Sequence, residues 1–307
     1  MEGPNGSVIF CVCCCNKGRM PKKPKVGLCF LVYHGVKHPG VWEQFFREGT
    51  DTDYEIIAHI KKPTKDTQPW LKSARVRSAR TGYCEFGLVS AHLKMVRQCL
   101  ALGCSHCVLI SQDCVPLWTR DDLLKRVKRM TKSRFCNVNG SEYPEFDIKA
   151  PEQEVAATKL RYHASQWSIL TKPVMEAYLT LETSAEGRAF RSYSYRIIRK
   201  YLAAQEVYIC ADERIPLSYL LQKLGRGDES VLRRYVDFPA PVTYVQWFPS
   251  NDMSPTPMNA TVAKKNVAKW RRQKAEWLLT RKVYPSAVHV VAFCLSKRSH
   301  YKKRSKK

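Results

Sequence analysis

Two adjacent carboxylates, Asp212 and Glu213, stand out in a chain that is otherwise strongly basic. A carboxylate within hydrogen-bonding reach of a hydroxyl can take its proton as the oxygen attacks, so Glu213 is a candidate general base. The neighbouring Arg214 favours the ionised form of Glu213, whereas Asp212 opposes it. The local sequence favours the other interpretation, in which the pair caps a helix that begins near Pro216, because acidic residues are common before helices. Both interpretations stay open on these residues alone.

The composition limits the class of partner. The chain has 307 residues, with 52 Lys and Arg against 27 Asp and Glu, and a net charge of +25. This charge predicts attraction to polyanions, namely nucleic acid, phosphorylated small molecules, sulfated glycans or an anionic membrane surface. A hydrophobic content of 44% favours one compact domain of catalytic size with tails. No apolar run reaches the roughly 18 residues of a membrane span and no signal peptide is recognised, so we expect a cytoplasmic or peripherally membrane-associated protein.

The two ends of the chain are basic. Residues 1–24 form a cysteine-rich leader and residues 294–307 a lysine-rich tail, and we expect both to be disordered. Clustered cysteines beside lysines and arginines are typical of S-acylation sites, which makes peripheral membrane contact through the leader an alternative to an unmodified leader. The odd number of thirteen cysteines favours mostly free thiols in a reducing compartment, although pairs could be bridged in a secreted chain. For Cys104 and Cys107 we prefer a turn with two half-buried thiols over a zinc site.

The first half of the chain alternates strands with helices. We predict buried strands at 26–33, 54–60 and 107–111, with helices at 42–47 and 87–102. Continuous apolar runs of this length are typical of a parallel sheet, and the alternation favours a nucleotide-binding type of α/β fold. Ligands of such sheets gather at the carboxyl ends of the strands, so His34 and Asp113 are expected at one edge.

The second half is predicted with less regular alternation. We expect helices at 121–131, 173–181, 189–204 and 217–224, strands at 166–170 and 242–247, and a loop or flap at 135–158. The helix at 189–204 is basic and carries interleaved tyrosines. Such interleaving would also suit a nucleic-acid-binding protein, which is the alternative from a different class.

Six segments of the chain are weak signals one by one, but their order along the chain is specific. They are FLVYHGVKHPGVWEQFF, LVSAHLKMVRQCLALGCSHCVLISQDCVPLW, SQWSIL, ADERIPLSYLL, VTYVQW and LLTRKVYPSA. In this order they resemble the core-2/I-branching β-1,6-N-acetylglucosaminyltransferase family, most closely its branch with plant and viral relatives, over residues 25–291. The resemblance implies a GT-A-type α/β fold with a mixed, mostly parallel sheet flanked by helices. Residues 25–134 would then form the nucleotide-sugar half and 135–293 the acceptor half of one domain.

The resemblance also implies an activity, namely inverting transfer of a sugar, typically N-acetylglucosamine, from a UDP-sugar to a hydroxyl of a glycan or glycoprotein. It places the catalytic base at Glu213, and it places further contacts at Val32, His34, Arg281 and Lys282 for the donor and at Ser165, Gln166 and Trp167 for the acceptor. To these we add Asp113 at the donor edge, Asp212 beside the base and Trp247 as an aromatic sugar platform. For the two tryptophans core packing is the competing interpretation.

No metal or cofactor is expected. Most GT-A enzymes hold the UDP with a divalent cation on an Asp-x-Asp motif, whereas in the family that the chain resembles Arg and Lys side chains take this role. Asp51 and Asp53 match the motif, but they precede a predicted strand instead of following one, so we discount them.

The chain also departs from the family pattern. The segments Ser90-Ala91-His92 and Tyr162-His163-Ala164 differ from the usual residues, and Arg214 replaces a usual histidine. Relatives are anchored in the Golgi, which makes such a location the alternative implied by resemblance. These departures keep open a relative that binds glycans without turnover.

Overall fold

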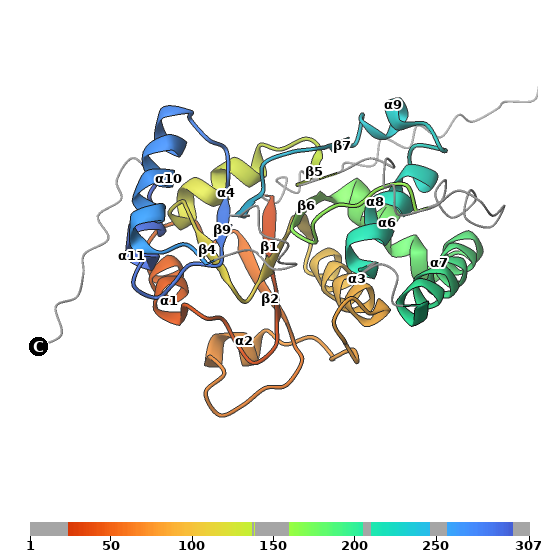
Figure 1. Cartoon of the computed structure of the whole chain (residues 1–307), viewed down its shortest axis with the longest axis horizontal. Helices are drawn as coiled ribbons and strands as arrows, with labels where there is room; N and C mark the ends of the chain where they lie inside the picture. The colour runs from red at the N-terminus through yellow and green to blue at the C-terminus, as the bar shows by residue number, and fades with distance from the viewer. Residues whose placement is uncertain (1–23, 137, 139–159, 205–209, 246–256, 297–307) are drawn as a thin grey trace, which may run out of the picture.

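The computed structural model describes residues 24–136, 138, 160–204, 210–245 and 257–296. Its centre is a six-stranded sheet with the strand order β2-β1-β3-β6-β5-β7 (Figure 1). The strands are β1 (Lys25–Val32), β2 (Tyr54–Ile60), β3 (Cys104–Ser111), β5 (Ser133–Phe135), β6 (Ser168–Thr171) and β7 (Val236–Asp237). β1 runs parallel to β2 and β3, β5 runs parallel to β7, and β6 is antiparallel to both of its neighbours. The predicted α/β class with a mixed, mostly parallel sheet flanked by helices is confirmed.

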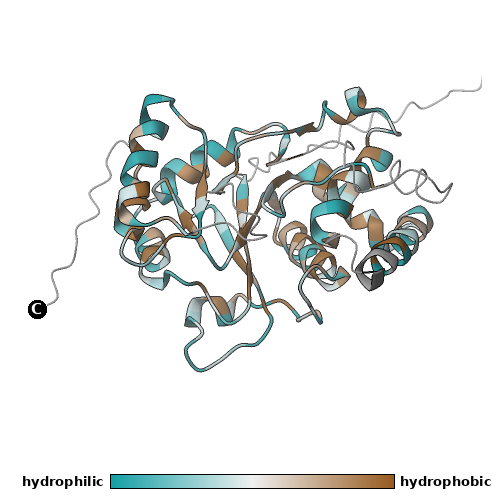
Figure 2. Ribbon diagram, viewed as in Figure 1, coloured by the Kyte–Doolittle hydropathy of each residue, from teal (hydrophilic) through white to brown (hydrophobic). Residues whose placement is uncertain are grey.

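The position of β1 explains its sequence. This strand lies between β2 and β3, and helices cover both faces of the sheet, so its successive side chains are buried whichever way they point. A central parallel strand therefore needs a continuous apolar run instead of an alternating one. Figure 2 shows hydrophobic residues along the central strands, whereas the loop that precedes α2 (Pro69–Ser73) is mostly hydrophilic.

One face of the sheet carries helices, α2 among them, and a second, smaller sheet. The other helices on this face are α1 (Pro39–Arg47), α4 (Arg120–Lys128), α10 (Ala260–Arg272) and α11 (Val288–Val291), and the small sheet has the order β4 (Cys114–Pro116), β9 (Leu279–Arg281), β8 (Thr243–Val245). Phe30 of β1 packs edge-on against Trp42 of α1 with ring centroids 4.8 Å apart. The indole N–H of Trp42 donates to the carbonyl of Cys114 at 3.1 Å, which joins α1 to the small sheet.

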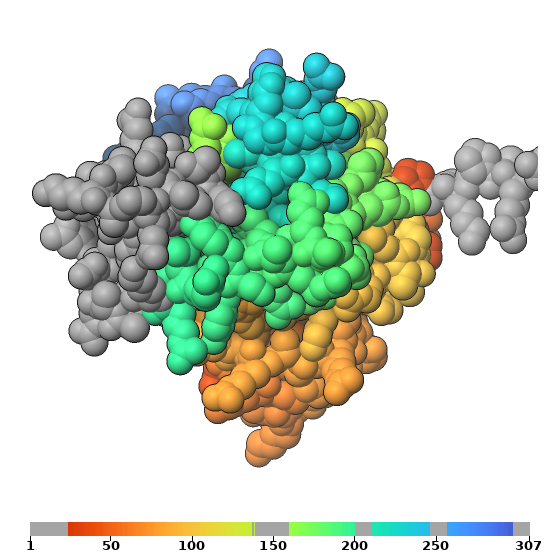
Figure 3. Space-filling model, turned by 90° about the vertical axis from the view of Figure 1, so that its right-hand side faces the viewer, coloured from red at the N-terminus to blue at the C-terminus, as the bar shows by residue number. Residues whose placement is uncertain are grey.

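The opposite face is covered by α3 (Phe86–Ala101), α6 (Lys172–Thr183) and α8 (Ala211–Lys223), and α7 (Ala185–Ala204) packs outside them (Figure 1). Figure 3 shows α6 and α7 forming the middle of this side of the molecule, below the region of the short helix α9 (Glu229–Leu232). The three inner helices come from both predicted halves of the chain, so the apolar core on this face joins the two halves.

Some predicted boundaries are wrong, and some elements were not predicted. α8 begins at Ala211 instead of Leu217, so its first turn includes the acidic pair. Helix α10 and most of the small sheet had no predicted counterpart. Cys294 is 3% exposed and belongs to the core, so the structured part extends beyond the predicted start of the tail. Most of the predicted leader, the tail and the predicted flap lie outside the described residues. Of the helices in the described ranges, none has the length and apolar character needed to cross a membrane.

The cysteines of the described ranges are mostly free, as predicted, with one unpredicted disulfide between Cys84 and Cys210. The prediction of a turn at Cys104 and Cys107 is wrong, since both residues belong to β3 and are buried.

Candidate active site

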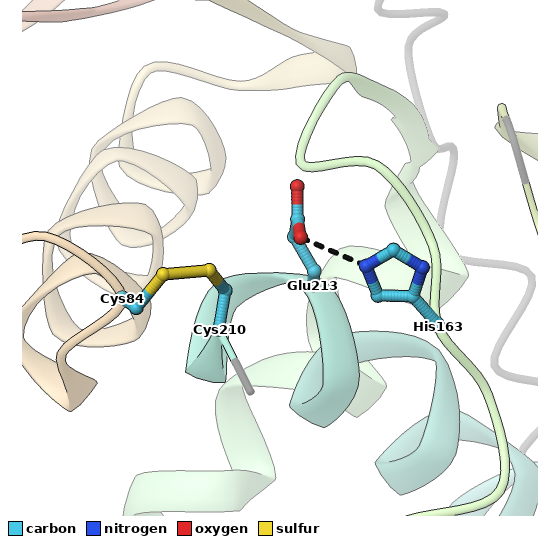
Figure 4. Close-up of a disulfide and its surroundings, with 4 residues drawn as sticks. All are labelled: Cys84, His163, Cys210 and Glu213. Atoms are coloured by element: carbon cyan, nitrogen blue, oxygen red, sulfur yellow. Dashed lines mark hydrogen bonds and ion pairs between the residues drawn. A yellow bond between two sulfur atoms is a disulfide. The ribbon is translucent and has the colours of Figure 1, made fainter. Parts of the chain in front are cut away.

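A disulfide holds the start of α8 against the segment that precedes α3. It joins Cys84 to Cys210, and the N–H of Ala211 donates to the carbonyl of Cys84 at 3.2 Å (Figure 4). The N–H of Glu213 in turn donates to the carbonyl of Cys210 at 3.1 Å, which closes the first turn of the helix. The covalent bond and these hydrogen bonds fix the backbone from which Glu213 projects.

The acidic pair lies inside the helix instead of before it. Asp212 and Glu213 occupy the first turn of α8, where the positive end of the helix dipole favours negative charge. Pro216 sits within the helix, where its ring nitrogen has no hydrogen to donate to the carbonyl of Asp212. The prediction that a helix begins near Pro216 is therefore wrong, and so is the interpretation of the pair as a cap that precedes it.

Glu213 is held by a histidine. Its Oε2 lies 2.8 Å from Nε2 of His163, and both side chains are about one quarter exposed (Figure 4). An ionised carboxylate can only accept, so Nε2 is the ring nitrogen that carries the proton when Glu213 is charged. The backbone adds a second link, because the N–H of Ala164 donates to the carbonyl of Glu213 at 2.8 Å. Oε1 of Glu213 has no partner within the described part of the chain, which leaves it accessible to a substrate hydroxyl.

Asp212 points into the core. It is 5% exposed, and its Oδ1 has no hydrogen-bond partner among the described residues. Burial raises the pKa of Asp212 to about 7, and the adjacent charge of Glu213 adds to the shift. Below about pH 7 Asp212 therefore mainly keeps its proton and adds little charge beside Glu213.

The loops after β1 and β3 meet at the carboxyl edge of the sheet, as predicted for His34 and Asp113. The N–H of Tyr33 donates to Oε1 of Gln112 at 3.0 Å, and the N–H of Lys37 donates to the carbonyl of Gln112 at 2.9 Å. The His34 ring is exposed and its Nδ1 lies 2.6 Å from the carbonyl of Lys62.

Val32, the last residue of β1, is buried. Its carbonyl accepts a hydrogen bond from the N–H of Lys61 at 3.0 Å. The side chain of Val32 can therefore shape the floor of a donor site more readily than contact the donor directly.

Asp113 forms ion pairs with two basic side chains at this edge. Its Oδ1 lies 2.6 Å from Nζ of Lys37, and its Oδ2 lies 3.6 Å from a guanidinium nitrogen of Arg281. Arg281 is the last residue of β9 and pairs with Cys114 of β4, the residue that follows Asp113. The small sheet is thus the element that brings a residue from the end of the chain to the carboxyl edge.

Arg281 connects this edge to the candidate base. Its guanidinium lies 4.2 Å from the ring centroid of Trp167, and its side chain is 11% exposed. Burial lowers the pKa of Arg281, while the charges of Asp113 and Glu213 are among those that oppose the shift. The ring beneath Arg281 belongs to Trp167, which follows Ser165 and Gln166, and these two residues line a pocket with Glu213.

Lys282 adds a further positive charge. Burial lowers its pKa, and the like charges of Arg281 and Lys37 act in the same direction. Its backbone has a φ of 35°, in the left-handed region that residues other than glycine rarely adopt. Lys37 and Arg281 pair with Asp113, and Lys282 follows Arg281 in sequence, so this edge carries more positive than negative charge, which suits a phosphate group.

The predicted acceptor residues lie in two different environments. Ser165 and Gln166 line a small pocket together with Asp212 and Glu213. Trp167 is 4% exposed, and Arg281 lies over its ring, so its clearest role is to pack beneath that arginine. Trp247 lies outside the described residues. The acceptor contacts of these residues stay predictions.

Asp51 and Asp53 lie elsewhere. They precede β2 at the amino end of the sheet, and Nζ of Lys128 bridges them at 2.8 and 3.3 Å. An ammonium group therefore already occupies the position between the two carboxylates, and the motif is far along the strand from the carboxyl edge. The structure agrees with the decision to discount this Asp-x-Asp motif as the donor metal site.

Sequence reasoning missed two members of the site. Lys37 follows β1 closely, so its place in the loop at the strand end was a signal that could have identified it. His163 was noticed only as a departure from the family pattern, and its contact with Glu213 spans 50 residues of sequence. No local pattern marks such a contact.

A mixed, mostly parallel α/β sheet flanked by helices, with charged residues beyond its carboxyl strand ends, is the architecture of nucleotide-binding α/β proteins, the class that includes GT-A glycosyltransferases. The family model of the Core-2/I-branching enzymes matches residues 28–274, which is most of the chain. The chain therefore belongs to the Core-2/I-branching enzyme family, a family of glycosyltransferases, and the predicted resemblance is confirmed. No curated protein matches the chain significantly.

Proposed function

We propose that the protein transfers a sugar from a UDP-sugar to a hydroxyl of a glycan acceptor with inversion at the anomeric carbon, and that the sugar is N-acetylglucosamine. Glu213 accepts the proton of the attacking hydroxyl, while Arg281, Lys282 and Lys37 stabilise the charge that develops on the departing UDP. The observation that carries the proposal is that Arg281 pairs with Asp113 and lies over Trp167, while the two residues before Trp167 line a pocket with Glu213.

The role of the base follows from its surroundings. A sugar hydroxyl is a weak nucleophile, and a positioned carboxylate contributes about 10²- to 10⁴-fold to its attack. His163 fixes one oxygen of Glu213 and leaves the other for the acceptor. A single base opposite the leaving group is sufficient for inversion, as in single-displacement glycoside hydrolysis. Asp212 favours its neutral form, so it adds little charge that would oppose ionised Glu213.

The leaving group needs positive charge, and the side chains supply it. Arg281 offers a planar guanidinium of low exposure, where electrostatic interactions are stronger than in water. Lys37 pairs with the same carboxylate and Lys282 follows Arg281, so phosphate oxygens can replace or join Asp113 as the partner of these cations. We therefore propose that turnover does not need a divalent metal.

The test is a UDP-release screen of the purified protein against a panel of UDP-sugars, with and without glycan acceptors. We expect acceptor-dependent UDP release, highest with UDP-N-acetylglucosamine, and a large loss in Glu213→Gln. Glycan binding without turnover by any donor would assign the chain to the binding-only alternative. Binding to nucleic acid that weakens steeply with salt and is unchanged in Glu213→Gln, without UDP release, would favour the nucleic-acid-binding alternative.

A further inference from the structure

Four buried cysteines face one another beneath α3. Cys29 comes from β1, Cys104 and Cys107 from β3, and Cys99 from α3. Each is at most 1% exposed, and none forms a disulfide. Cys84 and Cys210 of the same chain do form one. These thiols take no part in the proposed transfer reaction.

A bulge places the two cysteines of β3 on the same face. Residues three apart in a regular strand point to opposite faces. Here the pairing with β1 shifts by one residue, so that Cys104 lies opposite Lys25 and Cys107 opposite Gly27. Alternate residues of β1 share a face, and Cys29 follows Gly27 by two, so all three strand cysteines face α3.

Three of the sulfurs are spaced like the ligands of one metal ion. Sγ of Cys29 lies 3.4 Å from Sγ of Cys99 and 3.4 Å from Sγ of Cys107, and all three lie within 4.8 Å of one another. Thiolates that share a tetrahedral zinc ion at about 2.3 Å lie roughly 3.8 Å apart, so shifts of a few tenths of an ångström would suffice. Cys104 lies outside this group of three, but its Sγ is on the same side of Gly27 as that of Cys99, so it is the candidate for a fourth ligand after a larger shift.

Gly27 makes room for this arrangement. A Cβ atom at this position would lie 2.2 Å from Sγ of Cys99 and 3.6 Å from Sγ of Cys104. Any side chain at Gly27 would therefore displace the α3 cysteine from the strand cysteines. The sequence combines four cysteines with the one residue type that lets them converge.

We propose that Cys29, Cys99 and Cys107, with Cys104 as the fourth ligand, form a structural site for a thiophilic divalent cation of the zinc type. Soft thiolate ligands in a closed, buried shell favour such an ion and exclude a catalytic role, since no coordination position opens to substrate. The ion would join β1, β3 and α3. Each thiol that becomes a ligand releases its proton to solvent as the metal–sulfur bond forms.

Cys104 is the first residue of β3, whereas Asp113 follows the last residue of that strand. Cys29 and Cys107 lie in the middle of their strands, before the cationic edge at the strand ends, so the ion would contribute stability without entering the transfer chemistry.

The experiment measures metal content in the full chain. Protein from a Zn²⁺-supplemented culture is dialysed against a chelator to remove surface-bound metal, and bound zinc is measured by mass spectrometry. Cys107→Ala and Cys29→Ala are compared with Cys136→Ala, which removes a buried free thiol outside the cluster. Circular dichroism verifies that each variant is folded. In a second measurement, Cd²⁺ replaces zinc in the wild-type protein and reports thiolate coordination through its ultraviolet charge-transfer absorption.

We expect one zinc ion per chain in the wild-type protein and in Cys136→Ala, and at least a roughly 100-fold weaker retention in the two cluster variants. Cadmium thiolate absorption in the wild-type protein supports the site even where a variant does not fold. Folded wild-type protein without zinc, equal zinc in Cys107→Ala, or equal loss in Cys136→Ala would overturn the proposal. UDP release is a separate readout, so failure of the metal site and failure of the proposed function are distinguishable.

Discussion

Replacing Asp212 by asparagine should stabilise the protein at neutral and alkaline pH. The folded protein holds the Asp212 proton up to a pKa of about 7, whereas an unperturbed aspartate releases it near 3.8. The cause is burial, with the adjacent Glu213 charge adding to it. Each pKa unit corresponds to about 1.4 kcal/mol, so ionising the folded protein at this position costs about 4 kcal/mol as an upper figure. Asparagine keeps the shape of the side chain and cannot ionise.

The sign of the pH dependence follows from proton binding. Between pH 4 and 7 the folded state binds more protons than the unfolded state at Asp212, so the contribution of this residue to stability falls as pH rises. Below pH 4 both states are protonated and the penalty is absent. The difference in unfolding free energy between Asp212→Asn and wild type should therefore increase across this window by about 2 to 4 kcal/mol and stay constant above it.

The assay is urea unfolding followed by tryptophan fluorescence at pH values from 4 to 8. Asp237→Asn is the matched control, because Asp237 is about half exposed and forms only a 3.5 Å ion pair with Lys132. The control difference should change by less than about 1 kcal/mol over the same range. A difference for Asp212→Asn that does not vary with pH would refute the conclusion that this carboxyl is neutral because of its burial.

Three further predictions concern turnover. Activity should persist in EDTA, measured as UDP release, whereas complete loss that Mn²⁺ restores would contradict a transfer reaction driven by side-chain cations. Arg281→Ala should lower kcat by about 10²- to 10³-fold, because a buried charge at the leaving group is lost, whereas the exposed Arg129→Ala should leave it unchanged; equal effects would exclude a specific role. His163→Ala should lower kcat about 10- to 100-fold with little change in donor KM, because Glu213 loses the partner that orients it. An unchanged kcat would show that this hydrogen bond does not position the base.

The central sheet could be predicted because its signals are local. The apolar residues of β1 form one contiguous run, as do those of β2, and the helix predicted between the two strands indicated parallel pairing. The meeting of His34 and Asp113 at one edge followed from the rule that ligands gather at carboxyl strand ends. Glu213 was identified through the order of several motifs, since its own neighbourhood favoured a capping role.

Contacts that join distant segments could not be predicted. The disulfide between Cys84 and Cys210 closes a separation of 126 residues, and nothing in the spacing of thirteen cysteines selects that pair. β9 is a three-residue strand whose pairing with β4 depends on the tertiary fold, so the place of Arg281 beside Asp113 came only from resemblance. The start of α8 was misjudged because Pro216 is typical of a first helical turn, whereas here it lies within the helix.

The most direct test of the account is the rate of sugar transfer by Glu213→Gln, measured in single turnover with saturating UDP-sugar and a glycan acceptor. The exposed Glu43→Gln serves as the control. We predict that Glu213→Gln retains UDP-sugar affinity, because the amide keeps the shape of the side chain, while the transfer rate falls by about 10²- to 10⁴-fold and that of the control does not. A transfer rate in Glu213→Gln within about threefold of wild type would contradict the assignment of Glu213 as the general base.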